Sequence, residues 1–98
     1  MNLIKVAAGS RPAAIAGVIA NAVRRSGQAN IRAIGAAAVN QAIKAVVVAR
    51  KYLAEDGLDV VCIPSFVNLE IHGQERTAIQ MVVERRFADQ AAKRGRQQ

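Results

Sequence analysis

The sequence predicts an α/β protein of the α+β two-layer sandwich type, in which two helices cover one face of a four-stranded mixed sheet in the order βαβαββ. Three observations support this fold class. The chain has 98 residues, 52% of them hydrophobic, which suffices for one core but not for two. Two segments carry apolar residues at helical spacing, and the last third alternates apolar and polar residues as strands do. A short strand-like segment precedes each helix, so crossovers connect the strands.

The first strand and the first helix are expected within residues 3–25. Leu3 to Val6 is a short apolar segment typical of a strand. Ser10 followed by Pro12 predicts a helix N-cap with proline in the first turn, where its missing N–H costs little. Helical spacing continues until Ser26-Gly27, a pair that ends a helix.

A second strand and a longer helix follow. The strand surrounds Arg32 and is broken by Gly35, which takes the N-cap position because no Ser, Thr, Asp or Asn is available there. The helix is expected from Ala37 to Ala54 and is rich in alanine. Its predicted core stripe consists of Val39, Ile43, Val46 and Leu53.

The last third of the chain predicts a hairpin. The segment LDVVCIPSFVNLEI is long for one strand, and Pro64-Ser65 within it indicates a bend or an edge position. We expect Phe66 in the core. The turn is predicted at residues 72–75, and the returning strand has alternating apolar residues. The domain is therefore assigned to residues 1–86, and residues 87–98 are predicted to be a basic tail, either a frayed helix or disordered.

The composition argues against several classes of protein. A single cysteine, Cys62, excludes an internal disulfide and a Cys-rich zinc site, and a single histidine, His72, excludes a multi-histidine metal site. No carboxylate pair lies near His72 at a spacing suited to acid–base work, so we predict no enzyme, no catalytic residue, no cofactor and no small-molecule substrate. No apolar run is long enough to span a membrane, and Lys5 interrupts the N-terminal apolar segment. We expect a cytoplasmic protein.

The charges are segregated along the chain. The formal net charge is +7, and residues 1–51 contain eight Lys and Arg but no acid. Residues 52–84 contain six acids against Arg76 alone, and residues 85–98 are basic again. This distribution predicts an anion-binding surface formed by the first half and the tail, with an acidic patch around the hairpin.

The predicted topology gathers three connections at one edge of the sheet. Crossovers make the first three strands parallel, so the loops Ala8–Arg11 and Gly35–Ala37 and the hairpin His72–Arg76 are expected to meet where those strands end. Each helix N-terminus there presents unpaired N–H groups and a partial positive charge. Arg11 adds a guanidinium group that binds phosphate in a bidentate manner. The edge is thus a candidate phosphate site.

The second helix also predicts self-association. Val47 lies on the same helical face as the polar residues Asn40, Lys44 and Lys51. An apolar side chain in the middle of a polar face indicates a partner, so we predict a homodimer that uses Val47 and Lys51.

Several segments resemble a known bacterial family. The strings VAAGSRPAAIAGVIANAVRRSG, AIGAAAVNQAIKAVVVAR, VVCIPSF and HGQERTAIQMVVE resemble the stage V sporulation protein S family over about residues 2–86. That family is similar to the Alba superfamily of small chromatin and RNA-binding proteins, which shares the βαβαββ order. The resemblance implies an Alba-like fold and a site for DNA or RNA. The residues that it points to are Ser10, Arg11, Gly35, Asn40, Gln41, Lys44, Gln74 and Arg76.

Two functions remain open at this point. The first is nucleic-acid binding, mainly through backbone phosphates, with the regulatory role in sporulation or development that the resemblance implies. Alba hairpins are typically basic, whereas Glu70 and Glu75 flank this one, so we expect weaker binding than in chromatin-coating relatives or a preference for RNA or single strands. The alternative is a self-assembling interaction module, without nucleic acid, in which the basic half of one subunit meets the acidic hairpin of another.

Overall fold

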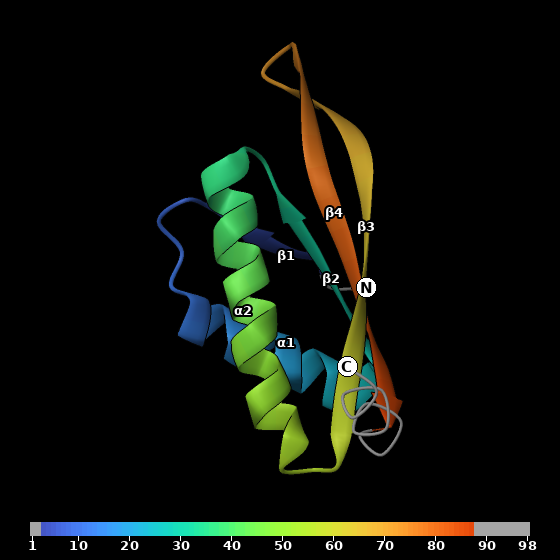
Figure 1. Cartoon of the computed structure of the whole chain (residues 1–98). Coiled ribbons are helices and arrows are strands. Elements are labelled where there is room, and N and C mark those ends of the chain that lie inside the picture. Colours follow the sequence, from blue (N-terminus) through green and yellow to red (C-terminus); the bar gives the residue numbers. More distant parts are fainter. Residues whose placement is uncertain (1–2, 88–98) are drawn as a thin grey trace, which may run out of the picture.

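Four strands form one mixed sheet, and two helices cover one of its faces (Figure 1). The computed structural model describes residues 3–87. The strand order in the sheet is β1-β2-β4-β3. The predicted α+β fold and its βαβαββ order are confirmed. The elements along the chain are β1 (Leu3–Val6), α1 (Pro12–Ser26), β2 (Gln28–Ala33), α2 (Ala36–Ala54), β3 (Leu58–Ile71) and β4 (Gln74–Phe87).

The strand directions point three strand ends toward the same end of the sheet. β1 runs parallel to β2, and both β2 and β3 run antiparallel to β4. β1, β2 and β3 therefore share one direction, as the crossovers required. We call the end of the sheet at which β1 and β2 stop, with the connections at residues 7–11 and 34–35, the carboxyl edge. The prediction that the hairpin turn meets these two connections is wrong, because β3 and β4 continue past the end of β2 and the turn at residues 72–73 lies beyond it.

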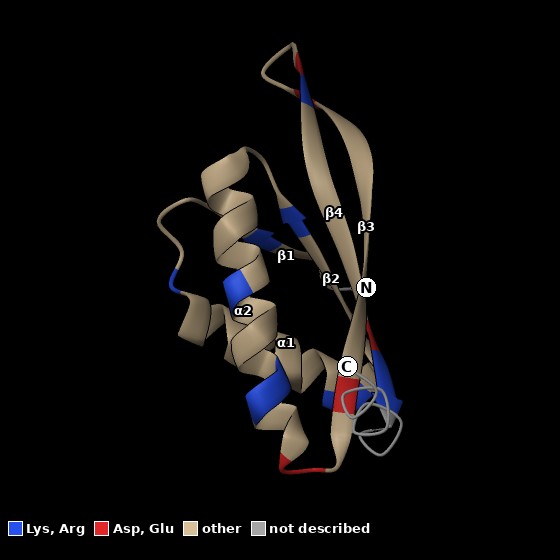
Figure 2. Cartoon of the chain, viewed as in Figure 1, with Lys and Arg blue, Asp and Glu red and all other residues tan. Residues whose placement is uncertain are grey.

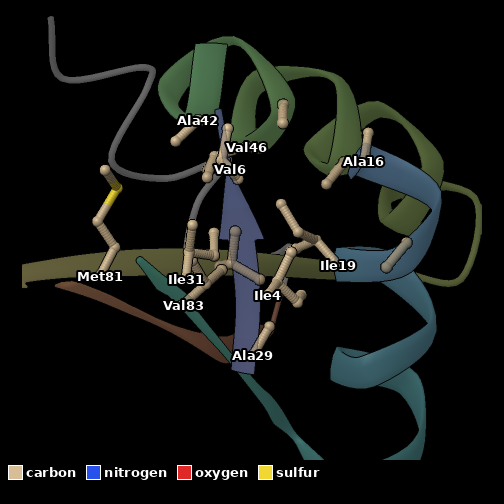
Figure 3. Close-up of a cluster of buried hydrophobic side chains, with 14 of the residues drawn as sticks. Ile4, Val6, Ala16, Ile19, Ala29, Ile31, Ala42, Val46, Met81 and Val83 are labelled. Atoms are coloured by element: carbon tan, nitrogen blue, oxygen red, sulfur yellow. The ribbon is translucent and has the colours of Figure 1, made fainter. Parts of the chain in front are cut away.

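The core lies between the sheet and the helices, and α2 contributes mainly alanines to it (Figure 3). The predicted stripe is correct for the buried Val46 and Leu53, but Val39 is only partly buried and Ile43 is 46% exposed. α2 packs against α1 as well as the sheet, and small side chains allow this close approach. Four alanines line the buried face of α2: Ala38, Ala42, Ala45 and Ala49.

The β3–β4 hairpin extends beyond the rest of the sheet. β2 pairs with β4 only as far as Ile79, whereas β3 and β4 stay paired up to the turn. Residues 67–78 therefore form a two-stranded arm that projects past the carboxyl edge (Figure 1). His72 and Gly73 both have positive φ, 51° and 76°, which is the backbone of a two-residue type I′ turn. β4 includes Phe87, and the rest of the predicted tail, 88–98, lies outside the described residues.

β3 is a single strand of 14 residues at the edge of the sheet. The edge position indicated by Pro64 is confirmed, and the register with β4 continues through Pro64 without interruption. The prediction that Phe66 is a core residue is wrong, because 77% of its surface is exposed. Phe66 pairs with Ile79 just before the arm, and it lines an open cavity between the hairpin and the start of α2 instead of packing in the core.

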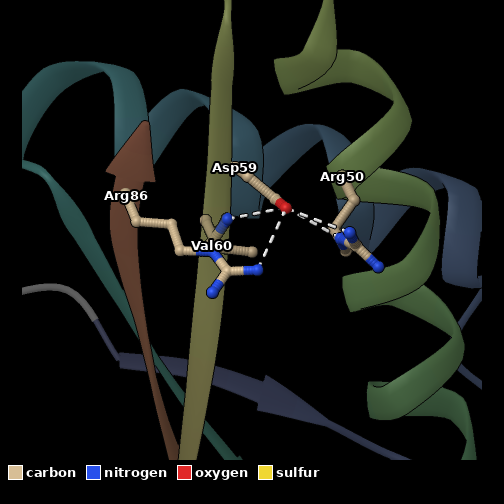
Figure 4. A network of polar contacts seen from close by, with 4 residues as sticks. All are labelled: Arg50, Asp59, Val60 and Arg86. Carbon is tan, nitrogen blue, oxygen red and sulfur yellow. Dashed lines mark hydrogen bonds and ion pairs between the residues drawn. The ribbon is translucent and has the colours of Figure 1, made fainter. Parts of the chain in front are cut away.

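At the end of the sheet opposite the carboxyl edge, acidic and basic side chains form ion pairs. The carboxylate of Asp59, which is 5% exposed, accepts hydrogen bonds from Arg50 Nε at 2.8 Å and Nη2 at 3.0 Å and from the Val60 N–H at 2.8 Å (Figure 4). Arg86 Nη2 lies 3.6 Å from Asp59 Oδ2. Arg24 Nε forms an exposed ion pair of 2.6 Å with Asp56. We call Arg24, Arg50, Asp56, Asp59 and Arg86 the paired end.

The contacts at the paired end shift the pKa values of Asp59 and Arg50. Burial by itself raises the pKa of Asp59, but hydrogen bonds from Arg50 and Val60 and the charges of Arg50 and Arg86 outweigh burial, so the pKa lies below its ordinary value. The hydrogen bond to Asp59, reinforced by the opposite charge, raises the pKa of Arg50. Asp59 is therefore ionised at neutral pH.

Cys62 and His72 lie far apart on the hairpin. Cys62 is half-buried against the core, and burial raises the pKa of its thiol, which favours the protonated form. His72 is exposed at the tip of the arm. Cys62 thus packs against the core as a small, partly buried apolar residue. Within residues 3–87, neither helix is both long and apolar enough to cross a bilayer.

Candidate functional site

The loop before α1 leaves the helix N-terminus without a side-chain cap. Ser10 was predicted as the N-cap, but Arg11 holds that position and makes no capping hydrogen bond. The hydroxyl of Ser10 instead accepts the Ala7 N–H at 2.9 Å, which closes the turn that leaves β1. Ile15 is the first helical residue whose N–H reaches back to the N-cap carbonyl, and no acid lies in the first turn. The helix dipole at this end is therefore uncompensated by a local carboxylate.

α2 begins in the same uncapped way. Gly35 is its N-cap, as predicted, with φ 90° and ψ 154° and no side chain to accept a hydrogen bond. This backbone region is accessible almost only to glycine. The first N–H to reach the Gly35 carbonyl is that of Val39, at 3.0 Å, and the first turn contains no acid. Both helices thus present N–H groups at their starts that an external anion can bind.

One hydrogen bond joins the two helix starts. Gln41 Nε2, one turn into α2, donates to the carbonyl oxygen of Ser10 at 2.8 Å, and this contact is partly buried. The loops that follow β1 and β2 are therefore adjacent. Gln41 was predicted to contact nucleic acid, and its amide nitrogen is used here to position the loop that carries Arg11.

Two basic side chains and one amide side chain near these helix starts are exposed to solvent. Arg11, Asn40 and Lys44 are all exposed. In residues 3–87 the ion pairs involve Asp56 and Asp59 only, so neither Arg11 nor Lys44 has an acid partner. Figure 2 shows the basic position of the loop before α1 and the upper basic position of α2 with no acidic segment near them. An unpaired cation beside an uncapped helix N-terminus favours the binding of an oxyanion.

The structure divides the predicted residues into two groups. Ser10, Arg11, Gly35, Asn40, Gln41 and Lys44 gather at the helix starts. Gln74 and Arg76 lie on the arm, where they pair with Ile71 and Leu69. Glu70 and Glu75 face each other between those pairs, so the arm has an acidic end. The first group forms the candidate site, and we call it the helix-start site.

An apolar patch that the sequence did not reveal lies beside this site. A cavity of about 520 Å³ separates the start of α2 from the hairpin, and its walls include Asn40, Ile43 and Phe66. Ile43 and Phe66 are both strongly exposed, and Val47, one turn further along α2, is 51% exposed. The predicted position of Val47 on an outer face is correct. The helical spacing of Ile43 resembles that of a core residue, which is why the sequence misplaced it.

The fold and the site together define a small α+β protein with an unpaired cationic edge next to an apolar patch. A comparison with protein families then gives its relationship. The model of the family described as Stage V sporulation protein S (SpoVS) matches residues 2–86, so the chain belongs to this family. The family places the chain among proteins with a role related to sporulation.

Proposed function

We propose that this protein binds nucleic acid at the helix-start site, chiefly through backbone phosphates, and that it exerts a regulatory role in sporulation or development in this way. The observation that carries the proposal is the hydrogen bond from Gln41 to Ser10, because it holds the loop before the uncapped start of α1 against the second turn of α2. Among residues 3–87, Arg11 and Lys44 have no acid partner. Two N-termini and two free cations suit successive phosphates of one strand.

The arm favours single strands or RNA over duplex DNA. Glu70 and Glu75 lie opposite each other near its tip, and Arg76 is the one cation between residues 70 and 76. Two carboxylates there repel a second phosphate backbone, so the arm is poorly suited to hold a duplex. A single strand needs only the helix-start site, where exposed Phe66 offers a nearby surface for one base.

Fluorescence anisotropy tests the proposal directly. Labelled 20-nucleotide DNA and RNA strands and the matching DNA duplex would be titrated with protein at several salt concentrations. We expect log affinity to fall linearly with log salt, and single strands to bind more tightly than the duplex. Arg11→Gln and Lys44→Gln should each weaken binding about five- to tenfold for every sequence and lower the salt slope by about one.

The matched control is Arg25→Gln. Arg25 is exposed and lies in the last turn of α1, away from the helix-start site, so its loss should leave affinity within about twofold. Binding that does not depend on salt, or equal losses in Arg11→Gln and Arg25→Gln, would contradict the proposal.

A second candidate function, self-association, rests on the apolar patch of Ile43, Val47 and Phe66. We propose a second copy of this chain as its occupant. Lys44 and Lys51 flank the patch on α2, and the acidic arm adjoins Phe66, so each copy presents both a basic and an acidic border to the other. A two-fold pairing brings these opposite charges together while covering the apolar side chains.

Sedimentation equilibrium tests this surface with two matched variants. Val47 and Val18 are equally exposed, 51% and 50%, but Val18 lies on α1 outside the patch. Val47→Asp should dissociate the assembly, because a buried interface tolerates an unpaired carboxylate poorly, and Val18→Asp should not. A monomeric unmodified protein refutes the assembly. An assembly that dissolves in salt, from a protein that binds none of the strands, would favour an interaction module without nucleic acid.

A further inference from the structure

Two cations stand side by side on the face of the sheet that the helices leave uncovered. Lys5 of β1 and Arg32 of β2 are register partners in a parallel pair. On each strand their immediate neighbours are buried in the core, so these two side chains point to the opposite face. Adjacent strands lie about 4.8 Å apart, and like charges at that separation destabilise the pair. An anion bound between the two cations would relieve this repulsion.

Within residues 3–87, no carboxylate is paired with these two cations. Arg32 Nη2 donates to Gln80 Oε1 at 3.0 Å, which fixes the guanidinium group against β4. Arg32 Nε is buried and has no hydrogen-bond partner. A guanidinium group whose hydrogen bonds are not all made within the protein favours an oxyanion nearby, because the anion compensates the buried positive charge.

A cavity of about 490 Å³ opens at these two cations. Its volume lies within the usual range for sites that hold small molecules. Ile34, Leu69 and Ile71 provide apolar walls, and the last two come from the arm. Two cations on one wall and three aliphatic side chains on the others match a ligand with one anionic group and a compact apolar body.

Glu70 limits the negative charge that a ligand of this cavity can carry. It also lines this cavity, is exposed, and pairs with neither cation. A second negative charge on the body of the ligand would approach this carboxylate and be repelled. The cavity therefore favours a molecule whose only anionic group is the one at Lys5 and Arg32.

We propose that this cavity binds a small organic anion, with its phosphate or carboxylate held by Lys5 and Arg32 and its apolar part against Leu69 and Ile71. The helix-start site does not include any of these residues, so this inference is independent of nucleic-acid binding. The sequence did not indicate it, because Lys5 and Arg32 come together only through the parallel pairing of β1 and β2.

Nitrogen–proton correlation spectra of the full chain test the cavity with four probes. Phenyl phosphate and phenylacetate have both an anionic group and an apolar ring, inorganic phosphate has only the charge, and phenol has only the ring. We expect saturable shifts at residues 5–8, 32–34 and 69–71 with at least one ring anion, at an affinity about tenfold or more above those of phosphate and phenol. The better of the two ring anions identifies the preferred head group.

Variants decide whether the two cations are responsible. Lys5→Gln and Arg32→Gln should each weaken the better ring anion about tenfold, and Arg25→Gln should leave its affinity unchanged. If Arg32→Gln fails to fold, Lys5→Gln and Leu69→Glu, both at positions outside the core, take its place. Lys5→Gln should retain the binding of nucleic acid, which separates failure of this inference from failure of the helix-start site. The inference is overturned by an absence of saturable shifts up to about 10 mM, by shifts elsewhere, or by undiminished affinity in the variants.

Discussion

The two ends of the sheet use the same kinds of charged residue in opposite ways. At the paired end, Asp59 neutralises Arg50 and Arg86, and Asp56 pairs with Arg24. At the carboxyl edge, Arg11 and Lys44 on the helix side and Lys5 and Arg32 on the other side have no acid partner among residues 3–87. The charges at the paired end are neutralised within the protein, whereas the cations at the carboxyl edge are available to bind an external anion.

This difference distinguishes the residues that stabilise the fold from the residues that are available to bind a ligand. Asp59 is buried, so its ion pairs contribute to folding, whereas Arg11 and Lys44 are exposed and support no other element. Substitutions at the paired end should therefore change stability, and substitutions at the carboxyl edge should change binding. The following experiments challenge that division, from the largest expected effect to the smallest.

Asp59→Asn should produce the largest loss of stability. The substitution keeps the shape of the side chain but removes the charge that balances Arg50 and the half-buried Arg86. We expect the free energy of unfolding to fall by about 3 kcal/mol in urea denaturation, the lower end of the range for a broken buried pair because Arg50 can reach water. Asp56→Asn, at an exposed pair, is the control and should cost less than about 1 kcal/mol. Equal losses would show that burial does not distinguish the two pairs.

Gly35→Ala measures the backbone strain at the carboxyl edge. A Cβ at Gly35 meets no atom within 4 Å, so the expected loss of about 1–3 kcal/mol comes from the φ of 90° alone. Gly17, inside α1, also has open space around it and no positive φ, and Gly17→Ala should stabilise the protein by about 0.5–1 kcal/mol. Thermal denaturation of both variants provides the comparison. Two stabilised variants would refute the strained geometry at the start of α2.

Lowering the pH should remove the stabilisation that Asp59 provides at the paired end. Because the pKa of Asp59 is lowered in the folded state, the unfolded chain binds more protons near pH 4, and the stabilisation is present above that pH. Stability should therefore fall as the pH drops below about 4. The difference in unfolding free energy between the unmodified protein and Asp59→Asn should shrink over the same range in denaturant titrations. A difference that stays constant down to pH 2 would contradict the lowered pKa.

Neutralising the free cations should have the smallest effect on stability. Arg11→Gln and Lys44→Gln remove no ion pair, so the free energy of unfolding should stay within about 0.5 kcal/mol of the unmodified protein. The same variants lose affinity for nucleic acid in the anisotropy experiment. A clear loss of stability in either variant would show that the carboxyl edge is not separate from the folding core.

The sequence was sufficient for the fold because each element has a strong local pattern. Alternation identified β4, helical spacing identified α1, and Pro64 indicated a bend or an edge position in β3, of which the structure shows the edge position. The shared carboxyl edge then followed from crossover handedness. Local patterns failed where a tertiary neighbour decides the environment. Ser10 closes a turn instead of capping α1, and Phe66 is exposed because an open cavity separates the hairpin from the start of α2.

The candidate site was predicted in part for the same reason. Glycine and proline at the helix starts located Arg11 and Gly35 from local sequence. The contact between Gln41 and Ser10 joins residues distant in the chain, and so does the pairing of Lys5 with Arg32. Such contacts depend on strand order and register, which residue spacing does not encode.

Pro64 lies near the middle of the 14-residue free edge of β3. A long exposed edge invites another chain to add a strand, which is a common route to fibrils. Proline has no N–H, and the unbroken register with β4 is consistent with the missing donor facing the open side. The edge is thereby divided into two shorter stretches, each a weaker template for aggregation. Pro64 therefore lowers the tendency of this edge strand to pair with the strands of other chains.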